Sequence, residues 1–151
     1  MKDVKQAAKE VRKVLKARWP LTKFSVRSKS YAGGSSVDIE WTDGPAEAEV
    51  REATKPFKGY ANGYYNKYGN TSRHTSRAVM VAAAKAVASL YGMPVPKILG
   101  DDRPYCTDLT RVGDEALCDE VHRATWATSV YDKNPDEAFA DWHAYKVLFS
   151  Q

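Results

Sequence analysis

Two short runs of alternating apolar and polar residues constrain the fold of this chain most strongly. Every second side chain is apolar in residues 23–28 (Phe24, Val26) and again in residues 35–42 (Val37, Ile39, Trp41). A period of two places successive side chains on opposite faces of a β-strand. Residues 32–34, Ala-Gly-Gly, supply the backbone freedom of a tight turn. The two runs therefore predict an antiparallel β-hairpin with one apolar face.

Helical spacing accounts for most of the other apolar residues. Residues 2–18 predict an amphipathic helix, because an apolar line (Val4, Ala8, Val11, Leu15) runs opposite a row of Lys and Arg. Four further helices are predicted. The first lies between Pro45 and Pro56, and the second runs from a cap at Thr75 or Ser76 to Tyr91. The third begins at about Asp114 and the fourth after Asn134. Segments 57–71 and 93–108 contain several Gly or Pro residues and predict irregular connections.

Length and composition are those of one domain. The 151 residues are enough for a single core, and we expect one α+β domain over residues 1–151, in which the N-terminal helix and three or four further helices pack on a small sheet. No run approaches the roughly 20 apolar residues of a membrane helix, and no secretory signal follows the Lys-rich amino terminus. Cys106 and Cys118 are too few for a disulfide scaffold. We therefore expect a cytoplasmic protein.

Charge is arranged in blocks along the chain. Residues 1–30 hold 10 Lys or Arg and two acids, whereas residues 31–54 hold six acids and one Arg. Residues 55–100 have seven basic residues and no acid, and residues 101–151 have 11 acids and five basic residues. The blocks either neutralise one another across the fold or leave separate faces that steer a charged partner.

Metal and catalytic motifs are weak. Cys118 and His122 share a helical face, but with Cys106 and His143 they do not match the spacing of a structural zinc site, so no metal or other cofactor is expected. No nucleophile motif surrounds Cys106 or Ser76. We expect no catalytic residues, although a small enzyme acting on nucleotides or on a host protein stays an alternative.

Basic residues interleaved with tyrosines form the strongest binding signal. The first helix and the segment 58–77 provide the candidate binding residues, namely Lys5, Lys9, Lys16, Tyr64, Tyr65, Lys67, Tyr68 and Arg73. Lys and Arg neutralise phosphates and Tyr stacks on exposed bases. The same residue types suit recognition of a protein, since Tyr offers a large contact area at low entropic cost. The surface is expected to contact either a protein or a nucleic acid.

One long segment carries a family resemblance. Residues 24–45 read Phe-Ser-Val-Arg-Ser-Lys-Ser-Tyr-Ala-Gly-Gly-Ser-Ser-Val-Asp-Ile-Glu-Trp-Thr-Asp-Gly-Pro. This segment resembles the large polyvalent protein associated domain 29, as do the basic helix before it and the Phe57-x-Gly59 turn after it. That α+β family occurs in proteins of phages and other mobile elements. The resemblance covers residues 1–60 best and extends to about residue 92, before a helical part at about 113–150. Asn62 stands where the family usually has an acidic residue.

The resemblance implies an accessory protein that works inside a bacterial host cell. Mobile elements encode many small proteins that disable host defences, so we expect a binding protein whose partner is a host protein complex, such as a CRISPR or restriction nuclease. This expectation rests on association rather than on chemistry. A direct nucleic-acid-binding protein is the alternative, and no membrane partner is expected.

Overall fold

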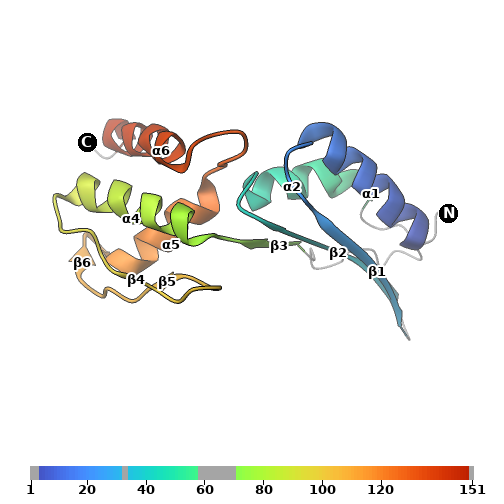
Figure 1. Cartoon of the computed structure of the whole chain (residues 1–151), viewed down its shortest axis with the longest axis horizontal. Helices are drawn as coiled ribbons and strands as arrows, with labels where there is room; N and C mark the ends of the chain where they lie inside the picture. The colour runs from blue at the N-terminus through green and yellow to red at the C-terminus, as the bar shows by residue number, and fades with distance from the viewer. Residues whose placement is uncertain (1–3, 32–33, 58–70, 150–151) are drawn as a thin grey trace. The chain divides into compact units, whose positions relative to one another are not determined.

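The computed structural model describes residues 4–31, 34–57 and 71–149, which form helices and small sheets in an α+β arrangement (Figure 1). The expected fold class is confirmed. The chain divides into two compact units, Met1–His74 and Thr75–Gln151, which are described separately below. The family resemblance, in contrast, extends to about residue 92.

The first unit contains a three-stranded sheet in the order β1-β2-β3. Strands β1 (Ser25–Tyr31) and β2 (Gly34–Thr42) pair antiparallel, with Val26 opposite Ile39 and Tyr31 opposite Gly34. This pairing confirms the predicted hairpin. Strand β3 (Thr71–His74) pairs with β2 in parallel. No strand was predicted there, and its first residue, Thr71, ends the segment 57–71 that was expected to be irregular.

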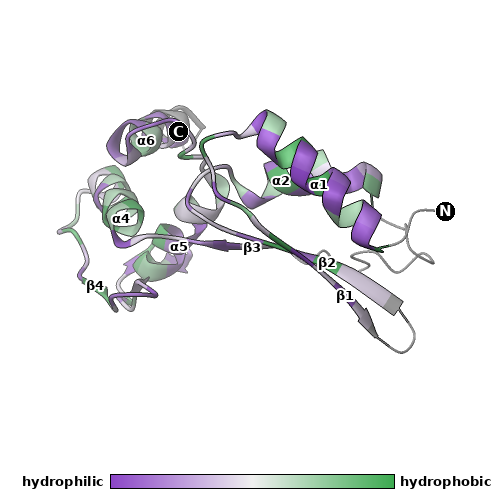
Figure 2. Ribbon diagram, turned by 45° about the vertical axis from the view of Figure 1, so that its right-hand side comes forward, coloured by the Kyte–Doolittle hydropathy of each residue, from purple (hydrophilic) through white to green (hydrophobic). Residues whose placement is uncertain are grey.

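Two helices, α1 (Val4–Arg18) and α2 (Glu47–Thr54), lie against one face of this sheet (Figure 1). A short 3-10 helix, η1 (Lys55–Phe57), follows α2. The side chains that meet between helices and sheet are completely or almost completely buried, and they include Val11, Leu15, Val37, Ile39 and Val50. Each such burial contributes about 1.5–3 kcal/mol. Hydrophobic and hydrophilic residues alternate along α1, as expected for a helix with one buried face (Figure 2).

Three aromatic rings connect the end of α1 to both hairpin strands. The ring centroids of Trp19 and Phe24 are 6.1 Å apart, and those of Phe24 and Trp41 are 5.5 Å apart. The buried indole nitrogen of Trp41 donates a hydrogen bond to the Pro45 carbonyl at 3.1 Å. This bond ties the end of β2 to the start of α2.

The second unit is built around α4 (Arg77–Tyr91), which packs against α5 (Leu117–Ala127) and α6 (Pro135–Phe149). Its core contains Val87, Leu117, Val121 and Phe139, all at most 1% exposed. Two small antiparallel pairs precede α5. Strand β4 (Ile98–Leu99) pairs with β5 (Tyr105–Cys106), and β6 (Arg111–Val112) pairs with β7 (Glu115–Ala116).

The ends of α4 and α6 follow the predicted capping signals. Ser76 Oγ accepts a hydrogen bond from the Val79 backbone N–H, and Gly92 ends α4 in the left-handed conformation at φ 62°. Asn134 Oδ1 accepts from the Asp136 N–H at 2.9 Å. In contrast, α5 begins three residues later than the expected start at Asp114, because the turn between β6 and β7 includes that residue.

Candidate functional site: the basic face of α1

Helix α1 turns four basic side chains to one side. Lys5, Lys9, Arg12 and Lys16 are all exposed, and at 100° per residue they fall within an arc of about 60°. From Lys5 to Lys16 this row extends about 16 Å along the helix axis. We call these four residues the basic face of α1. The apolar residues of α1 are buried on its other side, so the amphipathic pattern itself directs the basic face outward.

Arg12 has a second, structural role. Its Nη2 donates a hydrogen bond to the Val26 carbonyl of β1 at 2.8 Å. This carbonyl belongs to the edge strand of the sheet, and covering such groups protects a sheet against unwanted pairing. Lys5, Lys9 and Lys16 form no hydrogen bond with the part of the sheet that the structure describes, so they are the better residues for testing a surface interaction without disturbing the fold.

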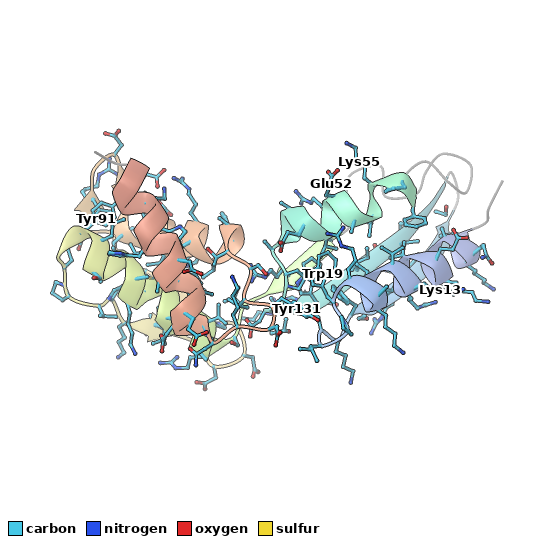
Figure 3. The ribbon with its side chains drawn as sticks, turned by 90° about the horizontal axis from the view of Figure 1, so that it is seen from above. Lys13, Trp19, Glu52, Lys55, Tyr91 and Tyr131 are labelled. Atoms are coloured by element: carbon cyan, nitrogen blue, oxygen red, sulfur yellow. The ribbon has the colours of Figure 1, made fainter. Side chains whose placement is uncertain are left out.

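Helix α2, which packs beside α1, differs in charge. Its exposed residues include Glu49 and Glu52, and Lys55 follows in η1. In Figure 3, Lys13 points away from α2 and Glu52 and Lys55 point away from α1. The helical layer of the first unit therefore has a basic side along α1 and a mixed side along α2.

The predicted binding residues have different outcomes. Lys5, Lys9 and Lys16 lie together on the basic face of α1, where they stay candidates for partner contact. Arg73 is only half-exposed, and its guanidinium donates to the carbonyls of Asp43 at 2.9 Å and Gly44 at 3.4 Å. Burial lowers the pKa of this guanidinium, against the raising effect of Asp43 and the acids of α2. Arg73 thus holds the loop after β2. The other four candidates, Tyr64, Tyr65, Lys67 and Tyr68, lie outside the described residues.

The sheet face opposite α1 and α2 is polar. Glu40 Oε1 of β2 and His74 Nε2 of β3 form a hydrogen bond, and both side chains are exposed. Lys29 forms an ion pair with Asp38 across the hairpin at 3.4 Å. His74 thus contacts a neighbouring strand, and Ser76 of the same His-x-Ser sequence caps α4.

The second unit contains a carboxyl pair, the partly exposed Glu115 and the buried Glu120. Glu120 is 7% exposed, and Oε2 of Glu120 and Oε2 of Glu115 are both buried without a donor. Arg123 Nη2 lies 2.5 Å from Glu115 Oε1, and this bond lowers the pKa of Glu115. Burial, followed by hydrogen bonding to Glu115, raises the pKa of Glu120. A proton on Glu120, which the raised pKa favours, would supply the missing donor and would then be shared with Glu115. Sequence spacing gave no signal for this pair.

Cys106, Cys118 and His122, which were weighed as metal ligands or catalytic groups, lie in or beside the core of the second unit. The Cys106 backbone N–H donates to His122 Nε2 at 3.2 Å, and the His122 ring meets Trp126 edge-on. Both cysteines are buried, and burial raises the pKa of each thiol, which disfavours a reactive thiolate. Within residues 4–31, 34–57 and 71–149, no three His, Cys, Asp or Glu side chains form a group that could hold a metal ion.

These features define a small α+β protein with a charged helical surface. The chain belongs to the family of the large polyvalent protein associated domain 29, whose model matches residues 2–93, and this membership confirms the resemblance. Family membership associates the protein with phages and other mobile elements. No curated protein and no solved structure matches the chain. The helices that the structure describes are all too short or too polar to cross a membrane.

Proposed function

We propose that this protein is a non-catalytic accessory protein of a phage or other mobile element that acts by binding an acidic surface of a host defence complex. A CRISPR or restriction nuclease is the kind of complex we have in mind, and blocking its surface would inhibit it. The protein would need no cofactor and would act in the bacterial cytoplasm. The basic face of α1 is the observation that supports this proposal.

Six basic residues and one acid, Glu10, lie in α1, and the row from Lys5 to Lys16 is continuous. A row of like charges attracts a complementary surface before contact, which raises the association rate and selects against wrong partners. Lysines at an interface rim can keep their ammonium groups in water, so they attract a partner without being desolvated. The basic face is therefore suited to bringing the protein onto a negatively charged partner.

The surroundings of the basic face favour an acidic protein over an extended polyanion. A nucleic acid lying across α1 would also approach the mixed side along α2, where Glu49 and Glu52 repel phosphates and offset the attraction of Arg51 and Lys55. A compact acidic patch on a protein would meet the basic face alone. A nucleic acid running parallel to α1 would avoid α2, so direct nucleic-acid binding is the second candidate.

The proposal is tested by reversing charge on the basic face. In the triple variant Lys5→Glu, Lys9→Glu, Lys16→Glu, the protein should lose its protection of a phage against a CRISPR or restriction system in a plating assay. The matched control reverses three exposed lysines outside α1, in the variant Lys55→Glu, Lys85→Glu, Lys97→Glu, which has the same net charge. Equal protection by the two variants would contradict a role for the basic face. Absence of protection by the unmodified protein against every system tried would contradict the inhibitor proposal.

A gel-shift experiment separates the two candidates. Single- and double-stranded DNA and RNA are mixed with the protein at about 50 mM and 200 mM salt, the range over which phosphate contacts lose most of their affinity. If the protein binds a host protein, no salt-sensitive shift that depends on Lys5, Lys9 and Lys16 is expected. Such a shift, lost in the triple variant and kept in the control, would favour direct nucleic-acid binding instead.

A further inference from the structure

A groove in the second unit lies between the end of α5 and one side of α6. Its volume is about 500 Å³, which is within the usual range for small-molecule sites. Ala127, Ala138 and Trp142 form its apolar part, and Thr128 and Ser129 bring hydroxyl groups. All of its lining residues belong to the second unit, whereas the basic face of α1 belongs to the first.

Basic residues are concentrated at this groove although the unit around it is acidic. Residues 75–151 contain 8 Lys or Arg and 11 Asp or Glu. Three of these basic residues, Arg123, Lys133 and Lys146, line the groove, together with one acid, Asp141. If the charged residues of this unit were distributed at random, the groove would have more acidic than basic residues. The groove is therefore a local positive site in a negative unit.

The three cations are held in different ways. Arg123 forms an ion pair with Glu115, and Lys133 Nζ lies 3.9 Å from Asp141 Oδ2. The side chains of Arg123 and Lys133 are each about half exposed. The Lys146 ammonium lies 6.0 Å from the centroid of the Trp142 ring and has no ion pair with a described residue. Long, exposed pairs such as Lys133–Asp141 contribute little energy. Lys133 and Lys146 can thus turn to an incoming anion at small cost.

Two carboxyl groups near Arg123 affect the charge of the groove. Arg123, which lines the groove, bonds to Glu115, and burial raises the pKa of the neighbouring Glu120. A raised pKa favours the neutral form of Glu120, and this form would leave more positive charge at the groove than two carboxylates would.

We propose that this groove binds a small organic anion that has a phosphate or carboxylate group and a flat apolar body. The anionic group would lie between Lys133 and Lys146, with the hydroxyls of Thr128 and Ser129 within the same groove. The apolar body would lie against Ala127, Ala138 and Trp142. A ligand with only an anionic group, or only an apolar body, would contact just one of the two features of the groove, its cations or its apolar wall.

Binding can be measured by NMR on the full chain with three probes. Phenyl phosphate contains both parts of the proposed ligand, inorganic phosphate contains only the charge, and benzyl alcohol contains only the apolar ring. Phenyl phosphate should cause saturable shifts in the amide signals of residues 123–146, with an affinity in the millimolar range that is typical of a fragment of this size. No saturable shift, or equal binding of either partial probe, would overturn the proposal.

Charge variants locate the contact. Lys133→Gln with Lys146→Gln should weaken phenyl phosphate binding roughly tenfold, while Lys133→Arg with Lys146→Arg keeps the charge and should restore it. The control, Lys85→Gln with Lys97→Gln, removes two exposed charges elsewhere in the unit and should stay within about twofold. Equal weakening by the groove variant and the control would show general charge attraction only and would overturn the site.

Discussion

The two units of the chain use charge in opposite ways. Residues 1–74 contain 15 Lys or Arg and 8 Asp or Glu, a net charge of +7, whereas residues 75–151 contain 8 and 11, a net charge of −3. In the first unit the charge that stands out is the row of exposed bases on α1. In the second, titratable groups are buried, namely Glu120, Cys106 and Cys118. The first unit thus exposes its charge to solvent, whereas burial raises the pKa values of titratable groups in the second.

Large-to-small substitutions in the two cores should have the largest effect. Leu15→Ala in the first unit and Phe139→Ala in the second each remove a completely buried side chain and leave a cavity. We expect losses of about 2–5 kcal/mol for Leu15→Ala and about 3–5 kcal/mol for Phe139→Ala, measured by urea unfolding. Hydrogen exchange then shows which unit is weakened. If each variant lowered protection equally in both units, the division into two compact units would be contradicted.

Replacing the glycine that ends α4 should have an intermediate effect. Gly92 has φ 62°, and a Cβ added there meets no atom within 4 Å, so the cost of Gly92→Ala is that of the left-handed backbone alone. We expect a loss of about 1–2 kcal/mol in thermal or urea unfolding. The control is Ala78→Gly at an exposed position of α4, which tests ordinary helix propensity. A neutral Gly92→Ala would contradict the assigned helix end.

The carboxyl pair should make the second unit sensitive to pH in a predictable direction. The pKa of Glu120 is raised in the folded state, so its contribution to stability is present at low pH and is lost as pH rises through that raised value. Glu120→Gln keeps a neutral donor beside Glu115 and should remove this loss. The free energy of unfolding, measured from about pH 4 to pH 9, should thus fall less at high pH for Glu120→Gln than for the unmodified protein.

Glu115→Gln is the matched control for that experiment. The pKa of Glu115 is lowered, chiefly by Arg123, so its contribution is present above its ordinary pKa and is lost as pH falls. This variant should weaken the protein at neutral pH, where Arg123 loses its partner. Identical pH profiles for the two variants would show that the carboxyl groups do not share a proton.

Surface ion pairs should have the smallest effect. Lys29→Met removes the pair with Asp38 on the hairpin, where the Lys29 side chain is 65% exposed. Since exposed pairs contribute about 0–1 kcal/mol, we expect a small change in urea unfolding that disappears in high salt. A loss comparable with that of Leu15→Ala would mean that the open sheet face contributes to the core stability of the first unit.

Local signals predicted most of the fold. The hairpin followed from alternation, α4 from Ser76 and Gly92, and α6 from Asn134, because each signal acts within a few residues of itself. Strand β3 was not predicted because residues 71–74 are mostly polar and pair with β2, about 30 residues earlier. The two-residue strands β4 to β7 are too short to show a period.

The candidate sites also differ in whether local sequence signals could predict them. Helical spacing predicted the basic face of α1, because a helix surface is a local property. The role of Arg73 could not be predicted, since its partners Asp43 and Gly44 are 30 and 29 residues away. The groove also escaped prediction, because its cations come from α5, the following loop and α6, and only packing brings them together.

The most direct test of the account is chemical footprinting of lysines in the presence of the host complex that the plating assay identifies. The protein is treated with an amine-acetylating reagent alone and in the complex, and the modification of each lysine is measured by mass spectrometry. Our account predicts that Lys5, Lys9 and Lys16 become protected in the complex, while Lys85 and Lys97 stay as reactive as in the free protein. Unchanged reactivity of the three lysines of α1 in a saturated complex would contradict it.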